Sequence, residues 1–232
     1  MPVNMNSDTY PYERVQPGYL RFQGADEVPL KIIRYLLDLP DRNGYLPTDD
    51  NSRPRVRIAK YLWYEGENPL NNPLPTPAQK LSLVFDGEHP DVNTDEEKTK
   101  HPKGYRLFPQ VYWGPAELEA KVVLKCYMGR MYAQSELRAT VGLTFEILVN
   151  SNLEATTRTD AYARAYAIEC ALIDALHGVN IAGVGVVSLG RPAHIDNGSS
   201  VLHDNGTHVG RMLHMSIDWM EGSDSCTVEG CE

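Results

Sequence analysis

The sequence predicts an α+β protein in which a mostly antiparallel β-sheet is covered on one face by an alanine-rich helix. Three observations predict this fold: a long alternating strand, a helix directly after it, and further alternating runs on both sides of the pair. In the strand, residues 137–149, the odd positions are all apolar and most even positions are polar. Since successive side chains point to opposite faces, one face is apolar and the other polar. We therefore expect one covered face and one solvent-exposed face.

The helix expected over residues 159–176 should cover the apolar face of that strand. Small and apolar residues recur in it at helical spacing, at Ala161, Ala165, Ile168, Leu172 and Ala175. Polar residues at positions 156–160 offer N-caps, and Gly178 follows as a C-terminal cap. Because these side chains are small, the helix axis can approach the sheet closely.

Three more alternating runs predict strands over residues 117–132, 181–189 and 208–219. The first is separated from the long strand by a short turn at residues 134–136, which favours an antiparallel hairpin. Residues 191–207 read as a polar connection with two Asn-Gly turn dipeptides. The order strand, strand, helix, strand, strand is typical of an α+β domain.

The N-terminal part predicts an extended arm and then a short helix. The helix covers residues 28–39, with Pro29 in its first turn and Pro40 after its end. The arm, residues 1–27, contains several tyrosines and has two interpretations: a partly disordered terminus, or an arm that orders against a neighbouring subunit. We expect a single domain over residues 28–220 and a flexible polar tail over residues 221–232.

A proline-rich elaboration is expected over residues 41–115. Eleven of the sixteen prolines lie between Pro40 and Pro115, which argues against regular helices there. Alternation predicts short strands over residues 55–64 and 81–85, with a loop over residues 65–80 between them. The charged run at residues 91–103 predicts an exposed loop.

Charge and composition exclude some classes of partner. The net charge of −9 argues against a protein that grips nucleic acid electrostatically. No window approaches the roughly 20 apolar residues that cross a bilayer, and we find no targeting signal at the N-terminus, so no membrane partner is expected. Cys126 and Cys170 read as buried hydrophobes, which suggests a reducing compartment. In the tail, Cys226 and Cys231 are free or close a small disulfide.

The sequence shows no catalytic constellation, and we expect no catalytic, cofactor-binding or metal-binding residues. No nucleophile elbow, Cys/His pair or paired carboxylates are evident. The glycines at residues 183–190 follow a helix, whereas a phosphate-binding loop precedes one. The alternative is a small metal-dependent enzyme or metal-binding module that uses histidines and aspartates in and beside residues 194–214. These residues are His194, Asp196, His203, Asp204, His208, His214 and Asp218.

Residues 137–219 resemble the tail terminator (tail-completion) proteins of long-tailed bacteriophages. The resemblance lies in the long strand LRATVGLTFEILVNS, the helix TDAYARAYAIECALIDALHG, the strand VGVVSLG and the last strand HVGRMLHMSIDWME. It implies a structural protein of the virion, made in the bacterial cytoplasm, that forms a hexameric ring at the tail–neck junction. The implied partners are other copies of the chain, the tail tube protein and neck or connector proteins, with DNA passing through without specific binding. The proline-rich residues 41–115 depart from the compact members and read as an insertion.

The polar face of the long strand is the surface that we expect to meet the ring lumen or a neighbouring subunit. Its residues are Arg138, Thr140, Thr144 and Glu146.

Overall fold

The computed structural model describes residues 25–40, 45–85, 99–110, 122–133, 138–156, 163–190, 198–203 and 208–220. The expected arm up to residue 24, the turn at 134–136, the tail from residue 221 and most of the charged run at 91–103 lie outside them. Residues 25–27 form a 3₁₀ turn, η2 (Ala25–Glu27), that leads into α1 (Val28–Leu37). None of the described helices is long and apolar enough to cross a membrane.

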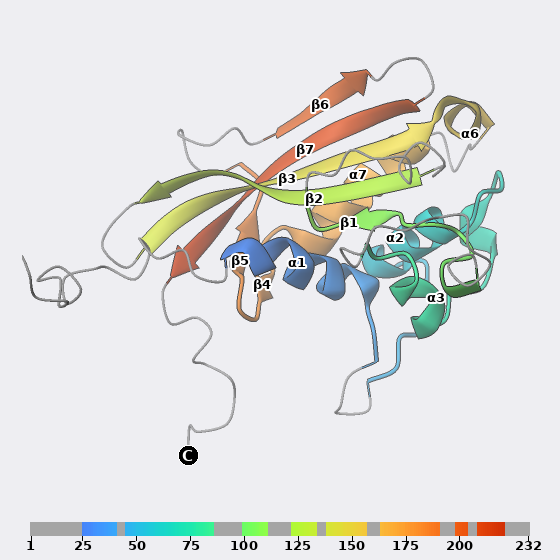
Figure 1. The fold of residues 1–232 in the computed structure, drawn as a ribbon, viewed down its shortest axis with the longest axis horizontal. Coiled ribbons are helices and arrows are strands. Elements are labelled where there is room, and N and C mark those ends of the chain that lie inside the picture. The colour runs from blue at the N-terminus through green and yellow to red at the C-terminus, as the bar shows by residue number, and fades with distance from the viewer. Residues whose placement is uncertain are drawn as a thin grey trace, which may run out of the picture.

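The fold is α+β, as predicted, and three long antiparallel strands form its centre (Figure 1). They are β2 (Val122–Ala133), β3 (Arg138–Asn150) and β7 (His208–Met220), and β3 lies between the other two. Beyond β2 lies the two-residue strand β1 (Leu107–Phe108), which is parallel to it. The far edge of β7 pairs with two separate strands.

These two edge strands are β5 (Gly185–Ser188) and β6 (Gly198–His203), which pair with different parts of β7. The further strand β4 (Asn180–Ile181) pairs with β5, so the single strand predicted over residues 181–189 is a hairpin of two short ones. Strand β6 lies inside the segment predicted to be a polar connection. The prediction missed it because serine and glycine give its alternation little apolar contrast.

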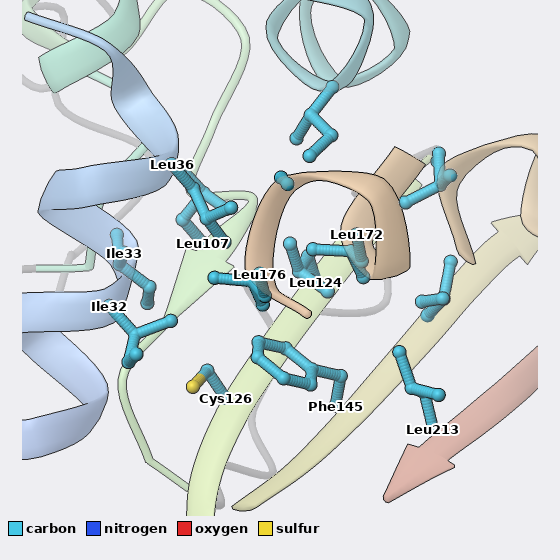
Figure 2. Packing of buried hydrophobic residues seen from close by; sticks show 14 of the residues in the cluster. Ile32, Ile33, Leu36, Leu107, Leu124, Cys126, Phe145, Leu172, Leu176 and Leu213 are labelled. Carbon is cyan, nitrogen blue, oxygen red and sulfur yellow. The ribbon is translucent and has the colours of Figure 1, made fainter. Parts of the chain in front are cut away.

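The apolar face of β3 is covered by helices, as predicted (Figures 1 and 2). Its odd positions from Ala139 to Val149 are almost completely inaccessible to solvent. Leu172 and Leu176 of α7 (Arg164–Leu176) pack in the same core as Phe145 of β3. Helices α1 and α2 (Pro54–Trp63) supply further side chains to this core.

The N-terminal end of α7 is capped in a way that differs from the prediction. Thr156 belongs to a separate short helix, α6 (Ser151–Thr156), and the other predicted caps, residues 157–160, lie outside the described residues. The Glu154 carboxylate of α6 accepts a hydrogen bond from the backbone N–H of Ala165 at 3.0 Å. Burial raises the pKa of Glu154, and this hydrogen bond opposes that rise. A carboxylate from a neighbouring helix therefore satisfies a free N–H in the first turn of α7.

The prediction of short strands in the proline-rich segment is wrong. Residues 55–63 belong to α2, with Tyr64 as its C-cap, and residues 77–81 form α3 (Pro77–Leu81), with the 3₁₀ turn η3 (Pro69–Asn71) between them. Each of the three begins with a proline, because proline suits the first helical position, where its missing N–H would have no partner within the helix. Residue 84 forms only an isolated bridge to residue 107. Since α2 packs against α7 in the main core, this part of the segment is not an outward elaboration.

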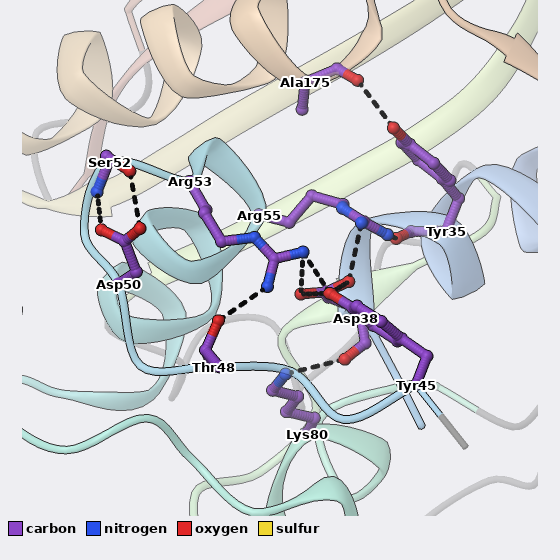
Figure 3. A network of polar contacts seen from close by, with 10 residues as sticks. All are labelled: Tyr35, Asp38, Tyr45, Thr48, Asp50, Ser52, Arg53, Arg55, Lys80 and Ala175. Carbon is purple, nitrogen blue, oxygen red and sulfur yellow. Dashed lines mark hydrogen bonds and ion pairs between the residues drawn. The ribbon is translucent and has the colours of Figure 1, made fainter. Parts of the chain in front are cut away.

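A buried aspartate, Asp38, joins α1, α2 and α3 through its carboxylate and its backbone carbonyl (Figure 3). Asp38 ends α1 in the left-handed conformation, with φ of 49°, and its side chain is fully buried. One carboxylate oxygen lies 2.8 Å from the guanidinium of Arg55, and the Tyr45 hydroxyl and Arg53 approach the same group. Lys80 of α3 donates to the Asp38 carbonyl oxygen at 3.1 Å, and burial lowers the pKa of this lysine. Asp38 therefore holds the three helices together.

Candidate functional site

The even positions of β3 lie on the face of the sheet away from α1, α2 and α7 (Figure 1), which we call the helix-free face. Three of the four predicted site residues lie there, but they are buried: Thr140 is 1%, Thr144 4% and Glu146 7% exposed. The prediction that they form an exposed surface is therefore wrong. The fourth, Arg138, begins β3, and its side chain lies outside the described residues.

Polar partners across the sheet explain how these side chains tolerate burial. Lys125 of β2 lies opposite Glu146, with its Nζ 3.3 Å from the carboxylate. The Tyr127 hydroxyl donates to the same carboxylate at 2.5 Å. Burial, and then this hydrogen bond, raises the pKa of Tyr127. Thr144 hydrogen-bonds with Nδ1 of His214 on β7, at 3.1 Å. Because buried charges are costly unless they are paired, this row fixes the register of the three central strands.

A second, smaller core covers one end of the helix-free face. Phe85, Tyr105 and Phe108 pack against Val123 of β2 and Leu148 of β3. Tyr105 and Phe108 come from the segment that carries β1, and Phe85 ends the described segment that carries α3. Leu148 is the one apolar residue at an even position of β3. This exception to the alternation was a signal in the sequence that part of the polar face is covered by other apolar side chains.

A small hollow of about 140 Å³ lies beside a β-bulge in β2. Met128 pairs with Leu143 and Met131 pairs with Val141, so two residues of β2 stand opposite one residue of β3. Gly129 and Gly142 both line the hollow and contribute no side chain to fill it. A bulge of this kind bends the strand that carries it and increases its local twist.

Apolar side chains are exposed at both edges of the sheet, among them Met131 and Tyr132 on β2 and Val201 on β6. Met131, just after the bulge in β2, is 40% exposed, and Val201 of β6 is 58% exposed. Each lies on an outermost strand of its part of the sheet. Exposed apolar side chains at strand edges are typical of surfaces that pair with another chain.

A groove with a volume of about 720 Å³ lies between α1 and α3. Its walls include Leu30 and Leu37 of α1 and Leu81 of α3. Arg34, Lys100 and His101 are the charged or titratable groups among its described lining residues. Within that described lining, no carboxylate faces these groups, so no acid–base pair is assembled there.

The metal-binding alternative requires its histidines and aspartates to converge. Of these residues, His194, Asp196 and Asp204 lie outside the described residues, as does the side chain of His203. His208 and His214 lie six positions apart on the extended strand β7, which separates them by about 20 Å. No three His, Cys, Asp or Glu residues in the described ranges gather as metal ligands do.

Comparison with known proteins adds a family to this geometry. A family model described as YomW matches residues 56–217, which is well over half of the chain. The chain belongs to the YomW family. This family is phage-like, of the Bacillus SPβ type. The YomW match begins in α2 and ends in β7, so it includes much of the segment predicted to be an insertion. No match was found among curated proteins or among solved structures.

Proposed function

We propose that this YomW-family chain is a structural protein of the virion that forms a ring at the end of a phage tail tube. In this role it joins the tail to the neck and lets DNA pass through. The observation that carries the proposal is the one-sided architecture of the sheet, with α1, α2 and α7 packed on a single face (Figure 1). Membership in a phage-like family supports a role in a phage particle.

One-sided sheets suit ring assembly because they leave a face and two edges for neighbours. Heterologous contacts between identical subunits close into a ring when the rotation between neighbours divides a full turn. We assign the helix-free face to the lumen. The more accessible polar groups on this face include His214 and Asp218 of β7. We expect these two residues to face the lumen in place of Thr140, Thr144 and Glu146 of β3, which are buried.

Passage of DNA is consistent with the charge of the chain. A net charge of −9 gives little of the cationic contact to phosphate that creates affinity for DNA. The ring would therefore guide the duplex without holding it. The implied neighbours are the tail tube protein on one side and neck or connector proteins on the other.

Immunogold labelling of virions from the phage that encodes the chain tests this role. Antibodies against the purified protein should label intact particles at the junction between tail and neck. Virions that contain no copies of the protein by mass spectrometry would contradict a structural role. Label at the tail tip or on the capsid would contradict the proposed position but retain a virion protein.

A further inference from the structure

We infer that neighbouring copies of the chain join edge to edge, with β2 of one copy beside β6 of the next. Their sheets then form one continuous antiparallel sheet. This inference rests on the proposed ring and specifies which surfaces build it. Four features of the described residues support it: two open strand edges, the placement of two exposed apolar side chains, the strand directions and the stagger between the two edges.

Both edges are open in the described part of the chain. Strand β1 pairs with β2 only at Leu124 and Lys125, and no other described strand lies beside β2 on that side. Strand β6 pairs with β7, and no described strand lies on its other side. Open edges present rows of backbone N–H and C=O groups, which another strand can pair with.

Met131 and Val201, one exposed apolar side chain from each edge, lie on the same face of the sheet, whereas the exposed Tyr132 of β2 lies on the other face. Met131 stands opposite Val141, which is in the main core. Val201 stands opposite Arg211, which in turn stands opposite the core residue Ile147. Directly opposed residues share a face, so both exposed side chains lie on the helix-covered face. Joining the two edges therefore extends one apolar layer from copy to copy and buries surface that each copy alone exposes.

The strand directions allow this contact without inverting either copy. Neighbouring strands in the order β2, β3, β7, β6 are all antiparallel, so β6 runs opposite to β2. A second copy placed beside the first in the same orientation therefore brings its β2 antiparallel to β6. The alternation of directions then continues unbroken through every subunit, as a closed sheet requires.

The stagger between the two edges also fits a closed sheet. We take the register in which Met131 of one copy stands opposite Val201 of the next. Within one copy Val201 lies opposite Arg211 of β7, whereas Met131 lies level with Ile217, through Val141 of β3. This offset of six residues is roughly 20 Å along the strands, against about 19 Å for four strand spacings. The strands would then be inclined by about 45°, at the upper end of the tilt of closed β-barrels.

Disulfide trapping with the full chain tests the edge contact. The variant Met131→Cys/Val201→Cys, with Cys226 and Cys231 changed to serine, is oxidised and digested, and disulfide-linked peptides are identified by mass spectrometry. Within one copy the two positions lie on strands three spacings apart, about 14 Å, which is too far for a disulfide. Any 131–201 disulfide therefore joins two copies. The matched control is Leu81→Cys/Val201→Cys, because Leu81 is also exposed but lies on α3.

We expect a ladder of covalent oligomers from the 131–201 pair and none from the control pair. Covalent dimers from Met131→Cys alone would show that two β2 edges face each other, which would overturn the inference. The same sample is weighed by native mass spectrometry before oxidation. A ring without 131–201 disulfides overturns the edge contact and leaves the ring, whereas monomers without disulfides overturn both.

Discussion

Lys125 Nζ lies 3.3 Å from the Glu146 carboxylate across adjacent strands, on the face of the sheet that no helix of the main core covers. Both residues are buried, so each is the main reason that the other can remain charged inside the protein. The pair also fixes the register of β2 against β3, because a slip of β2 by one residue would turn Lys125 to the apolar core and leave Glu146 without its cationic partner.

Removing one member of this pair should cost far more than removing both. Lys125→Met leaves the Glu146 carboxylate without its cationic partner, and we expect the free energy of unfolding to fall by about 3 kcal/mol. The double variant Lys125→Met/Glu146→Leu should recover most of that loss. Urea unfolding of both single variants and the double variant measures the coupling. Additive losses would show that the two side chains do not depend on each other.

Tyr127 should make the protein sensitive to alkaline pH. In the unfolded chain its hydroxyl titrates near pH 10.0, and in the folded protein burial and the bond to Glu146 raise its pKa. Below pH 10 both states keep the proton, so pH has no effect through this group. Above pH 10 the unfolded state releases the proton first, so the free energy of unfolding falls. Tyr127→Phe should show a shallower fall than the wild type in unfolding curves from pH 9 to 11, and an identical slope would refute this assignment.

Asp38 should be one of the most sensitive polar positions. Asp38→Ala removes the anion that Arg53 and Arg55 surround and places alanine at a positive φ, so we expect a loss of about 3 kcal/mol. Asp38→Asn tolerates the left-handed conformation and retains the hydrogen bond from Tyr45, so its loss should be smaller. Thermal unfolding by circular dichroism ranks the two. If the two variants lose equal stability, the left-handed backbone conformation at residue 38 adds nothing to the cost of removing the Asp38 charge.

The close approach of α7 to the sheet should make its small residues intolerant of larger ones. Ala171 of α7 is fully buried in the main core, which the sheet and helices α1 and α2 also build. Ala171→Leu adds three carbons to a packed site and should cost about 2 kcal/mol. Asp174→Leu, on the exposed side of the same helix, is the control for helix propensity. It also removes a largely exposed ion pair with Arg57, which contributes little, so it should change stability less. Stability unchanged by Ala171→Leu would mean that the interface contains unfilled space.

The sequence predicted the central strand and its covering helix because their patterns are long. Alternation over residues 137–149 carries enough apolar positions to fix which face is buried, and Ala139 to Val149 lie as expected. Helix α2 was missed because Val56 and Ile58 alternate like a strand, while Ile58 and Leu62 also fit helical spacing. Pro54 was read as a helix breaker, although it begins the helix. A short amphipathic run beside a proline can therefore fit the spacing of a strand and that of a helix equally well.

The candidate site was harder to predict because its burial depends on contacts between distant residues. Thr144 and Glu146 look like solvent-facing residues until Lys125, Tyr127 and His214 are placed opposite them. Opposite charges on two strands expected to form a hairpin were a usable signal for part of this row. No local pattern shows that Phe85, Tyr105 and Phe108 pack over the end of the same face. The open edges likewise emerge only from the strand order, which sequence periodicity does not determine.

Native mass spectrometry of the full chain, with negative-stain images of the same sample, tests the central claim most directly. At micromolar concentration and physiological salt we predict closed rings of a single stoichiometry, with six subunits expected from the resemblance to tail terminators. Substituting lysine for Val201 at the open edge of β6 should shift the sample toward monomers, whereas the same substitution at Leu81 should leave the rings intact. Monomers of the unmodified chain at every concentration, together with images that contain no rings, would contradict the account.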